Sequence, residues 1–211
     1  PDLKHTVADN IDLRYEYFPK SSEQFMVGMF YKRLQDPIEY GLLNEGQDTY
    51  YKPMNFGDAT NLGVEVDIMK CFNWFGIKAN YTYTHSTITT EKRIMDGNDV
   101  KTVSQTRPLF GQAAHVANLS LLFKSTKYGW EGQIAGSYTG KRLSDISNWY
   151  NDDIWEDGYM QLDASVEKSF KNGISVFAKA SNLLDTPLLR FIQSGPQTAS
   201  VTSERKDGNV I

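Results

Sequence analysis

Eight segments of this 211-residue chain alternate apolar and polar side chains with a period of two, and no helical period of comparable length competes with them. Successive side chains of a β-strand point to opposite faces, so each segment would carry one apolar and one polar face. In the first segment Ile11, Leu13 and Tyr15 alternate with Asp12 and Arg14. The predicted strands are Ile11–Tyr17, Phe25–Tyr31, Leu62–Ile68, Ile77–Tyr83, His115–Phe123, Trp130–Tyr138, Met160–Val166 and Ile174–Ala180.

The connections between these strands alternate between short and long without exception. Outer-membrane barrels have short periplasmic turns at one end and long external loops at the other, whereas a soluble sandwich has no reason for this asymmetry. Structureless loops of about 25 residues would also count against a compact soluble domain. The fold class predicted is therefore all-β, an antiparallel up-and-down transmembrane β-barrel segment of about eight strands. The short connections are residues 19–22, 71–75, 125–129 and 170–173, and the long ones are about 34–61, 87–114 and 140–158.

The composition fits strands with one apolar and one wet face. Aromatic residues make up 13% of the chain, although the mean hydropathy is −0.48. The formal net charge of −4 gives no basic excess that would indicate nucleic-acid binding. The sequence contains no run of about 18 apolar residues, so it predicts no transmembrane helix. Aromatic residues gather beside the short turns, as in an interfacial girdle, and they are Tyr15, Tyr17, Phe18, Phe72, Trp74, Phe75, Tyr128, Trp130 and Phe170.

The residue types needed for metal binding or catalysis are not grouped. Cys71 is the single cysteine, which excludes an intramolecular disulfide. His5, His85 and His115 are too far apart in sequence to give a metal-ligand spacing. No Ser/His/Asp grouping with a supporting turn motif occurs. We therefore predict no cofactor, no metal site and no enzymatic activity.

Five groups of short motifs follow one another along nearly the whole chain. They are Asp9–Asp12 with Tyr15–Glu16, Phe30–Lys32 with Pro37–Glu39, Asn61–Val66, Tyr138–Arg142, and Asn182–Asp185, which reads Asn-Leu-Leu-Asp. Each motif is weak, but the ordered set is specific. It resembles TonB-dependent outer-membrane receptors, in which the last three groups are similar to a Gly-x-Glu strand, a Tyr-x-Gly strand end and an Asn-Leu-Phe-Asp element. Among these receptors, the chain is most similar to those of the Bacteroidetes type.

The resemblance implies that residues 1–211 are a C-terminal β-barrel segment, eight of the last nine strands of a barrel with 22. The plug domain, the TonB box and the last strand of the family have no counterpart in the sequence, and a polar stretch from Gln193 to Asn209 follows the last predicted strand. No returning strand is predicted beyond Asp185. Such a segment would have two open edges, which lipid does not tolerate. We therefore expect either closure into a small barrel or pairing with other chains.

The resemblance also implies a function and a location. Such receptors lie in the outer membrane and import scarce large solutes, such as siderophores, cobalamin or oligosaccharides, with energy from the TonB system acting through the plug domain. The expected partners are outer-membrane lipid, TonB through the absent plug, an extracellular solute and a surface lipoprotein. The first alternative is a self-contained eight-strand outer-membrane barrel with a structural or adhesion role. The second is a soluble β-protein that binds a ligand.

The third long connection is the candidate substrate-binding segment. Its residues Trp149, Tyr150, Asp152, Asp153 and Trp155 place aromatic rings beside carboxylates, which could stack on a sugar or hold Ca²⁺. The spacing is not that of an EF-hand, and an ordinary solvated loop with interfacial aromatics is the alternative. On the predicted strands, charges of both signs indicate a polar lumen or plug-facing wall, and they are Arg14, Glu16, Glu65, Asp67, Glu131, Asp163, Glu167 and Lys179.

Overall fold

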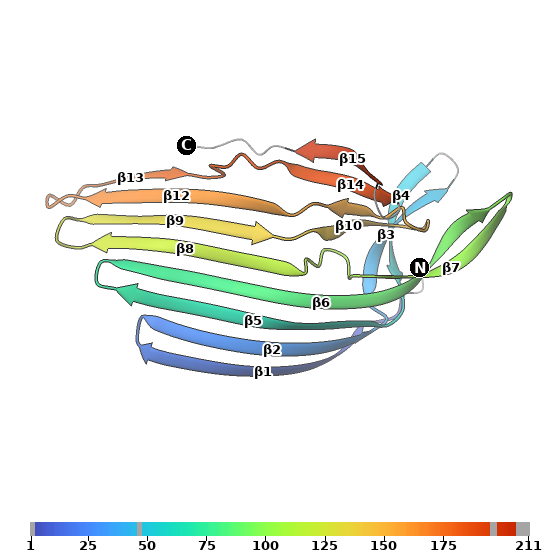
Figure 1. Cartoon of the computed structure of the whole chain (residues 1–211), viewed down its shortest axis with the longest axis horizontal. Helices are drawn as coiled ribbons and strands as arrows, with labels where there is room; N and C mark the ends of the chain where they lie inside the picture. Colours follow the sequence, from blue (N-terminus) through green and yellow to red (C-terminus); the bar gives the residue numbers. More distant parts are fainter. Residues whose placement is uncertain (1–2, 46–47, 195–197, 206–211) are drawn as a thin grey trace.

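The computed structural model describes residues 3–45, 48–194 and 198–205, and the regular secondary structure in these ranges is β-strand. Nine strands form a long sheet in which every neighbouring pair is antiparallel (Figure 1). The order along the sheet is β1-β2-β5-β6-β8-β9-β12-β13, and β7 pairs with β6. The strands are β1 (Val7–Lys20), β2 (Glu23–Gln35), β5 (Ala59–Phe72), β6 (Phe75–Asp96), β7 (Asp99–Arg107), β8 (His115–Ser125), β9 (Trp130–Thr139), β12 (Tyr159–Ser169) and β13 (Ser175–Ala180).

One face of the long sheet is apolar and uncovered. The eight predicted strands are confirmed, and their register aligns the apolar residues of neighbouring strands. Ile11, Leu119 and Val176 are 69%, 51% and 58% exposed, because no other part of the described chain packs on this face. The burial of apolar surface drives folding in water, so this face requires an apolar surrounding. One continuous row contains Tyr17, Phe25, Ile68, Ala79, Leu119, Gly136 and Leu162.

The opposite face of the long sheet is polar. The Asn118 amide donates a hydrogen bond to the Asn80 side-chain oxygen across the sheet, at 2.8 Å. The charged residues predicted to line a lumen lie on this face. Alternation along each strand therefore separates apolar from polar side chains across the whole sheet. One row on the polar face contains Met26, Asp67, Asn80, Asn118, Ser137 and Gln161.

The four short connections lie together at one end of the long sheet, which we call the turn end (Figure 1). They join β1 to β2, β5 to β6, β8 to β9 and β12 to β13, as predicted. Gly129 shows why one of these turns needs glycine. Its φ is +65°, and a Cβ there would lie 2.2 Å from the Ser169 carbonyl oxygen. A side chain at this position would therefore be both strained and blocked.

The long connections are not structureless, which corrects the prediction. At the opposite end, which we call the loop end, they form a second sheet, the loop sheet, with the order β15-β14-β11-β10-β3-β4. Strand β6 also runs beyond the long sheet and makes a protruding hairpin with β7 (Figure 1). The pairing of β3 with β10 is parallel. The loop-sheet strands are β3 (Ile38–Glu45), β4 (Asp48–Asn55), β10 (Arg142–Ser147), β11 (Ile154–Glu156), β14 (Leu188–Ser194) and β15 (Thr198–Arg205).

A tight turn at Asn182–Asp185 directs the chain out of the long sheet after β13. Asn182 and Asp185 have φ of 52° and 47°, a left-handed conformation that Asn and Asp tolerate well. The Asn182 amide donates to the Asp163 carboxylate at 2.8 Å, and the Leu183 amide donates to the Leu162 carbonyl at 2.7 Å. The chain then forms β14 and β15, where no strand was predicted. Residues 195–197 and 206–209 of the polar stretch lie outside the described residues.

The long sheet is open. Strands β1 and β13 stand at its two ends and do not pair with each other (Figure 1). The prediction that the eight strands close into a small barrel is therefore wrong, and with it the alternative of a self-contained eight-strand barrel. Pairing of the two edges with other strands stays a prediction. No helix in the described ranges is long and apolar enough to span a membrane.

Candidate functional site in the loop sheet

A buried ion pair joins the second long connection to the third. The Lys92 ammonium on β6 lies 2.6 Å from the Asp153 carboxylate, and the two side chains are 1% and 2% exposed. The Ser147 amide donates to the same carboxylate oxygen at 2.8 Å, and the Ser147 carbonyl accepts a second bond from Lys92. These contacts fix the segment before β11 against the part of β6 that pairs with β7.

Burial carries an energetic cost for both Lys92 and Asp153. Burial lowers the pKa of Lys92, because it removes water from the ammonium, and the negative charge of Asp153 opposes that effect. The second Asp153 carboxylate oxygen is buried and has no hydrogen-bond partner in the described part of the chain. A buried pair of this kind resists disruption strongly, because loss of either partner leaves the other charge buried and unpaired.

A second buried pair joins the first long connection to the second. The Arg107 guanidinium on β7 lies 2.8 Å from the Glu39 carboxylate on β3, with side chains 1% and 6% exposed. The Phe110 amide donates to the other Glu39 oxygen at 2.7 Å. The guanidinium also lies 5.3 Å from the centre of the Phe56 ring. Glu39 therefore binds two donors, one from the end of β7 and one from the segment that follows it.

Two acids on the loop sheet connect the remaining segments. Asp145 on β10 accepts a hydrogen bond from the Tyr51 hydroxyl on β4 at 2.6 Å. Arg190 on β14 lies 3.7 Å from Asp145 and 3.6 Å from Glu156. Arg142 is paired with Glu156. Together with the two buried pairs, these contacts connect all three long connections and the segment after β13 into one unit.

The residues predicted to bind substrate lie within this unit, but they differ in accessibility. Tyr150 is the most open, with 40% of its surface exposed, and its backbone amide donates a hydrogen bond to the Arg93 carbonyl at 2.8 Å. Trp149 is half-buried, and the Asp152 carboxylate accepts a bond from the Ser147 hydroxyl at 3.0 Å. Asp153 is buried in its ion pair, so its carboxylate does not face the solvent.

Trp155 belongs to a feature that the sequence did not reveal. The Lys141 ammonium lies 4.5 Å from the centre of the Trp155 ring and 5.2 Å from that of Phe191. Trp155 and Phe191 are paired in register between β11 and β14. Phe191 lies in a segment that was predicted to be a loop, so the alternation of apolar and polar residues did not predict this contact. The ammonium and the two rings form a cation–π contact that fixes the Trp155 side chain against β14.

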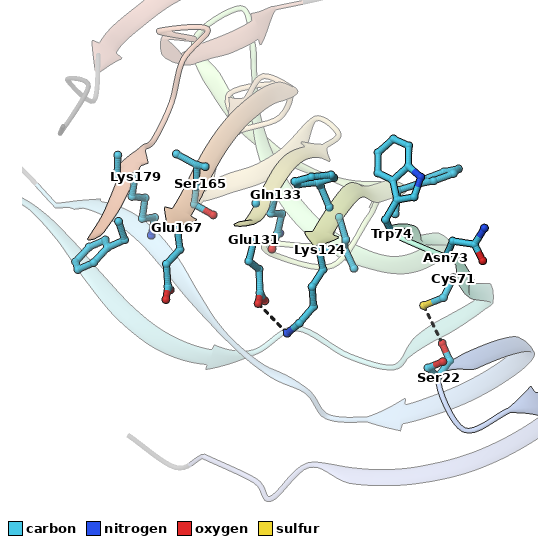
Figure 2. A pocket seen from close by; sticks show the side chains of 18 residues that line it. Ser22, Cys71, Asn73, Trp74, Lys124, Glu131, Gln133, Ser165, Glu167 and Lys179 are labelled. Carbon is cyan, nitrogen blue, oxygen red and sulfur yellow. Dashed lines mark hydrogen bonds and ion pairs between the residues drawn. The ribbon is translucent and has the colours of Figure 1, made fainter. Parts of the chain in front are cut away.

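A hollow of about 600 Å³ lies on the polar face near the turn end (Figure 2). Figure 2 shows Lys124, Glu131 and Glu167 pointing toward the concave side of the sheet, and Lys124 is 2.8 Å from Glu131. A smaller polar hollow of about 420 Å³, lined by Arg14 and Glu65 among others, lies farther along the same face. In the described ranges no group of three or more His, Cys, Asp or Glu side chains has a metal-binding arrangement.

The two faces and the two ends of the long sheet define the class of protein. An exposed apolar face, an opposite polar face, short turns at one end and folded loops at the other are the features of an outer-membrane β-barrel wall. The family model described as TonB dependent receptor-like, beta-barrel matches residues 1–183. The chain therefore belongs to the β-barrel family of TonB-dependent receptors, which are outer-membrane receptors and transporters rather than enzymes.

A solved structure shares the fold. It is the FrpB iron transporter from Neisseria meningitidis (F3-3 variant), with a TM-score of 0.58 and 12% sequence identity. The similarity covers 89% of this chain and 27% of the transporter, so the chain spans about a quarter of that protein's length. A comparison with curated proteins gives no match.

Proposed function

We propose that residues 1–211 form a C-terminal part of the barrel wall, with its external loops, in a longer outer-membrane receptor that imports a scarce large solute. A siderophore, cobalamin or an oligosaccharide would fit this role. The plug domain and its contact with TonB would belong to other parts of the receptor, and a surface lipoprotein is a further expected partner. The observation that carries the proposal is the family match over residues 1–183 of a chain whose long connections fold into a defined sheet.

The loop sheet supports this function because ligand-binding loops need a rigid support. The Lys92–Asp153 and Arg107–Glu39 pairs hold three long connections in one arrangement. Preorganised loops lose less conformational entropy when a solute binds. In this proposal Asp153 positions the third connection, and it does not contact the solute.

The proposed contact residues are Trp149, Tyr150, Asp152 and Trp155. Tyr150 is the sharpest probe, because its side chain is exposed and it is held through its backbone amide, which donates to the Arg93 carbonyl on β6. In the full receptor, Tyr150→Ala and Trp149→Ala should each weaken binding of the cognate solute about tenfold, as expected when an aromatic contact is lost. Binding to whole cells is measured with a panel of ferric chelates, cobalamin and oligosaccharides. The ferric chelates come first because FrpB is an iron transporter.

Trp130→Ala is the matched control, because Trp130 is an exposed aromatic residue at the turn end. It should leave solute binding unchanged. Limited proteolysis of the loops confirms that each variant keeps the loop sheet. If solute binding is unchanged in both loop variants while the control behaves identically, the third connection is not the binding segment.

A further inference from the structure

Lysine recurs at every one of the four short turns, but the lysines differ in their partners. Lys20 and Lys70 both pair with Glu23, at 3.7 and 2.7 Å, and Lys124 pairs with Glu131 on the polar face. The remaining turn-end lysines have no carboxylate partner in the described part of the chain, and they are Lys127, Lys168 and Lys171. All three come from the two neighbouring turns that flank β9 and β12.

Lys168 lies on the apolar face, although it is charged. It is in register with Trp130 on one side and Val176 on the other, two residues beyond Val166 on the same face. Its ammonium lies 4.9 Å from the centre of the Trp130 ring and 5.6 Å from that of Phe170. It also donates a hydrogen bond to the Tyr128 carbonyl. The cation is therefore held at the edge of a surface that faces lipid.

The other two lysines extend this positive edge. The Lys127 ammonium lies 5.3 Å from the centre of the Tyr128 ring, and Lys171 is exposed beside Phe170. Aromatic rings and lysines at such a boundary place their apolar parts in the hydrocarbon and their polar ends among the headgroups. Three ammonium groups without carboxylate partners would find their counter-charge in the headgroups of the adjacent leaflet.

A hollow on the apolar face adjoins this edge. It has a volume of about 760 Å³, and its lining is largely apolar. Gly132 contributes no side chain to it, and Gly132 is paired with Val166, one same-face step from the Trp130–Lys168 pair. Small residues on β12 and β13 widen the hollow. Its walls include Phe123, Ile134, Ala164, Val166 and Ala178.

We propose that this part of the apolar face is a binding site for an anionic phospholipid of the periplasmic leaflet. The phosphate group would lie among Lys127, Lys168 and Lys171, and an acyl chain would occupy the hollow floored by Gly132. The charge of the edge and the apolar lining of the hollow match the two halves of such a lipid. The site depends on placement in the outer membrane and is independent of the solute that the receptor imports.

The test uses the full receptor in phosphatidylcholine nanodiscs, with and without phosphatidylglycerol, and native mass spectrometry measures how much of each lipid stays bound. Wild type should retain phosphatidylglycerol in preference to phosphatidylcholine. Lys168→Gln should lower this preference about fivefold, and the triple change that also replaces Lys127 and Lys171 should lower it on the order of a hundredfold. Lys168→Arg keeps the charge and should keep the preference.

Lys124→Gln is the matched charge control, because Lys124 is also at a turn but lies on the polar face. Ala164→Phe fills the hollow and should reduce retention, whereas Ala117→Phe, on the same face near the loop end, should not. Equal retention of the two lipids by wild type would overturn the proposal. So would equal losses in the Lys168→Gln and Lys124→Gln variants. Solute uptake by the same receptor is a separate readout, so failure of the proposed import function would not alter these results.

Discussion

The loop end and the turn end of this chain differ in where their cations lie. At the loop end Lys92, Asp153, Arg107 and Glu39 are buried in pairs that join segments distant in sequence. At the turn end the lysines are exposed or held over aromatic rings, and the buried Glu23 carboxylate pairs with the exposed Lys20 and Lys70. Burying a charge is costly unless it is paired, so cations buried with their partners join the long connections, whereas the turn-end lysines keep their charge accessible to the surroundings.

The largest effect should come from breaking a buried pair at the loop end. Asp153→Ala leaves the Lys92 ammonium buried without its partner, which should destabilise the loop sheet by about 3–5 kcal/mol. Hydrogen exchange of the amides of β10 and β11 in the membrane-embedded receptor measures this loss. Asp96→Ala is the control, because its pair with Lys101 is exposed on both sides. That change should cost no more than about 0.5 kcal/mol. Similar small effects of the two variants would show that burial does not strengthen the loop-end pair.

The two ends also contain glycines with nearly the same backbone conformation in different surroundings. Gly97 at the tip of the β6–β7 hairpin has φ +64° and open space around its Cα, whereas Gly129 has φ +65° and the Ser169 carbonyl close by. Gly97→Ala should cost about 1 kcal/mol through backbone strain. Gly129→Ala should cost about 1–3 kcal/mol more, because the added methyl group clashes. Thermal unfolding of the two variants compares them, and equal costs would mean that the turn rearranges freely.

The smallest effect concerns pH. The hydrogen bond to Asp145, with burial and the charge of that carboxylate, raises the pKa of Tyr51 from its ordinary value of 10.0. In the unfolded loop this hydroxyl ionises at its ordinary pKa, so the contact is intact below about pH 10 and is lost as pH rises through the raised value. The lowered pKa of Lys92 has the opposite sign, and its contribution grows as pH rises toward 10.5.

Comparison of Tyr51→Phe with wild type separates these two effects, because Lys92 is common to both proteins. Hydrogen exchange of β4 and β10 should show a loss of about 1 kcal/mol in the variant near neutral pH. The difference should shrink above pH 10, where wild type loses the contact as well. A difference that stays constant with pH would show that the Tyr51 hydroxyl does not contribute through Asp145.

Eight strands of the long sheet could be predicted from the sequence because each carries its own alternation of apolar and polar residues, whereas β7 lies in a segment that was predicted to be a loop. The alternation in Ile11–Tyr17 is complete within one segment, and a shift of one residue would reverse its faces. The loop sheet has no such local signal. Asp153 has the appearance of an exposed ligand in sequence, and only its contact with Lys92, 61 residues away, buries it. The parallel pairing of β3 with β10 joins residues that are even farther apart in sequence, such as Gly41 and Ile146.

The same reason explains the part of the candidate site that was missed. Phe191 and Lys141 meet at Trp155 only after β14 has joined β11. Asn182 and Asp185 were identified as a motif, but their role in turning the chain out of the long sheet depends on backbone conformations that many sequences share. Local periodicity therefore predicts the strands of the long sheet, whereas ion pairs and turns between residues distant in sequence determine the loop sheet.

The most direct test of the account is the sidedness of the two ends in living cells. In a Cys71→Ser background, Asn98→Cys marks the tip of the β6–β7 hairpin and Asn172→Cys marks the turn between β12 and β13. A maleimide that does not cross the outer membrane is added to cells that make the full receptor. We predict that the cysteine at position 98 is labelled in intact cells and that the one at position 172 is labelled only after the outer membrane is permeabilised. Labelling at position 172 but not at position 98 in intact cells would contradict the account.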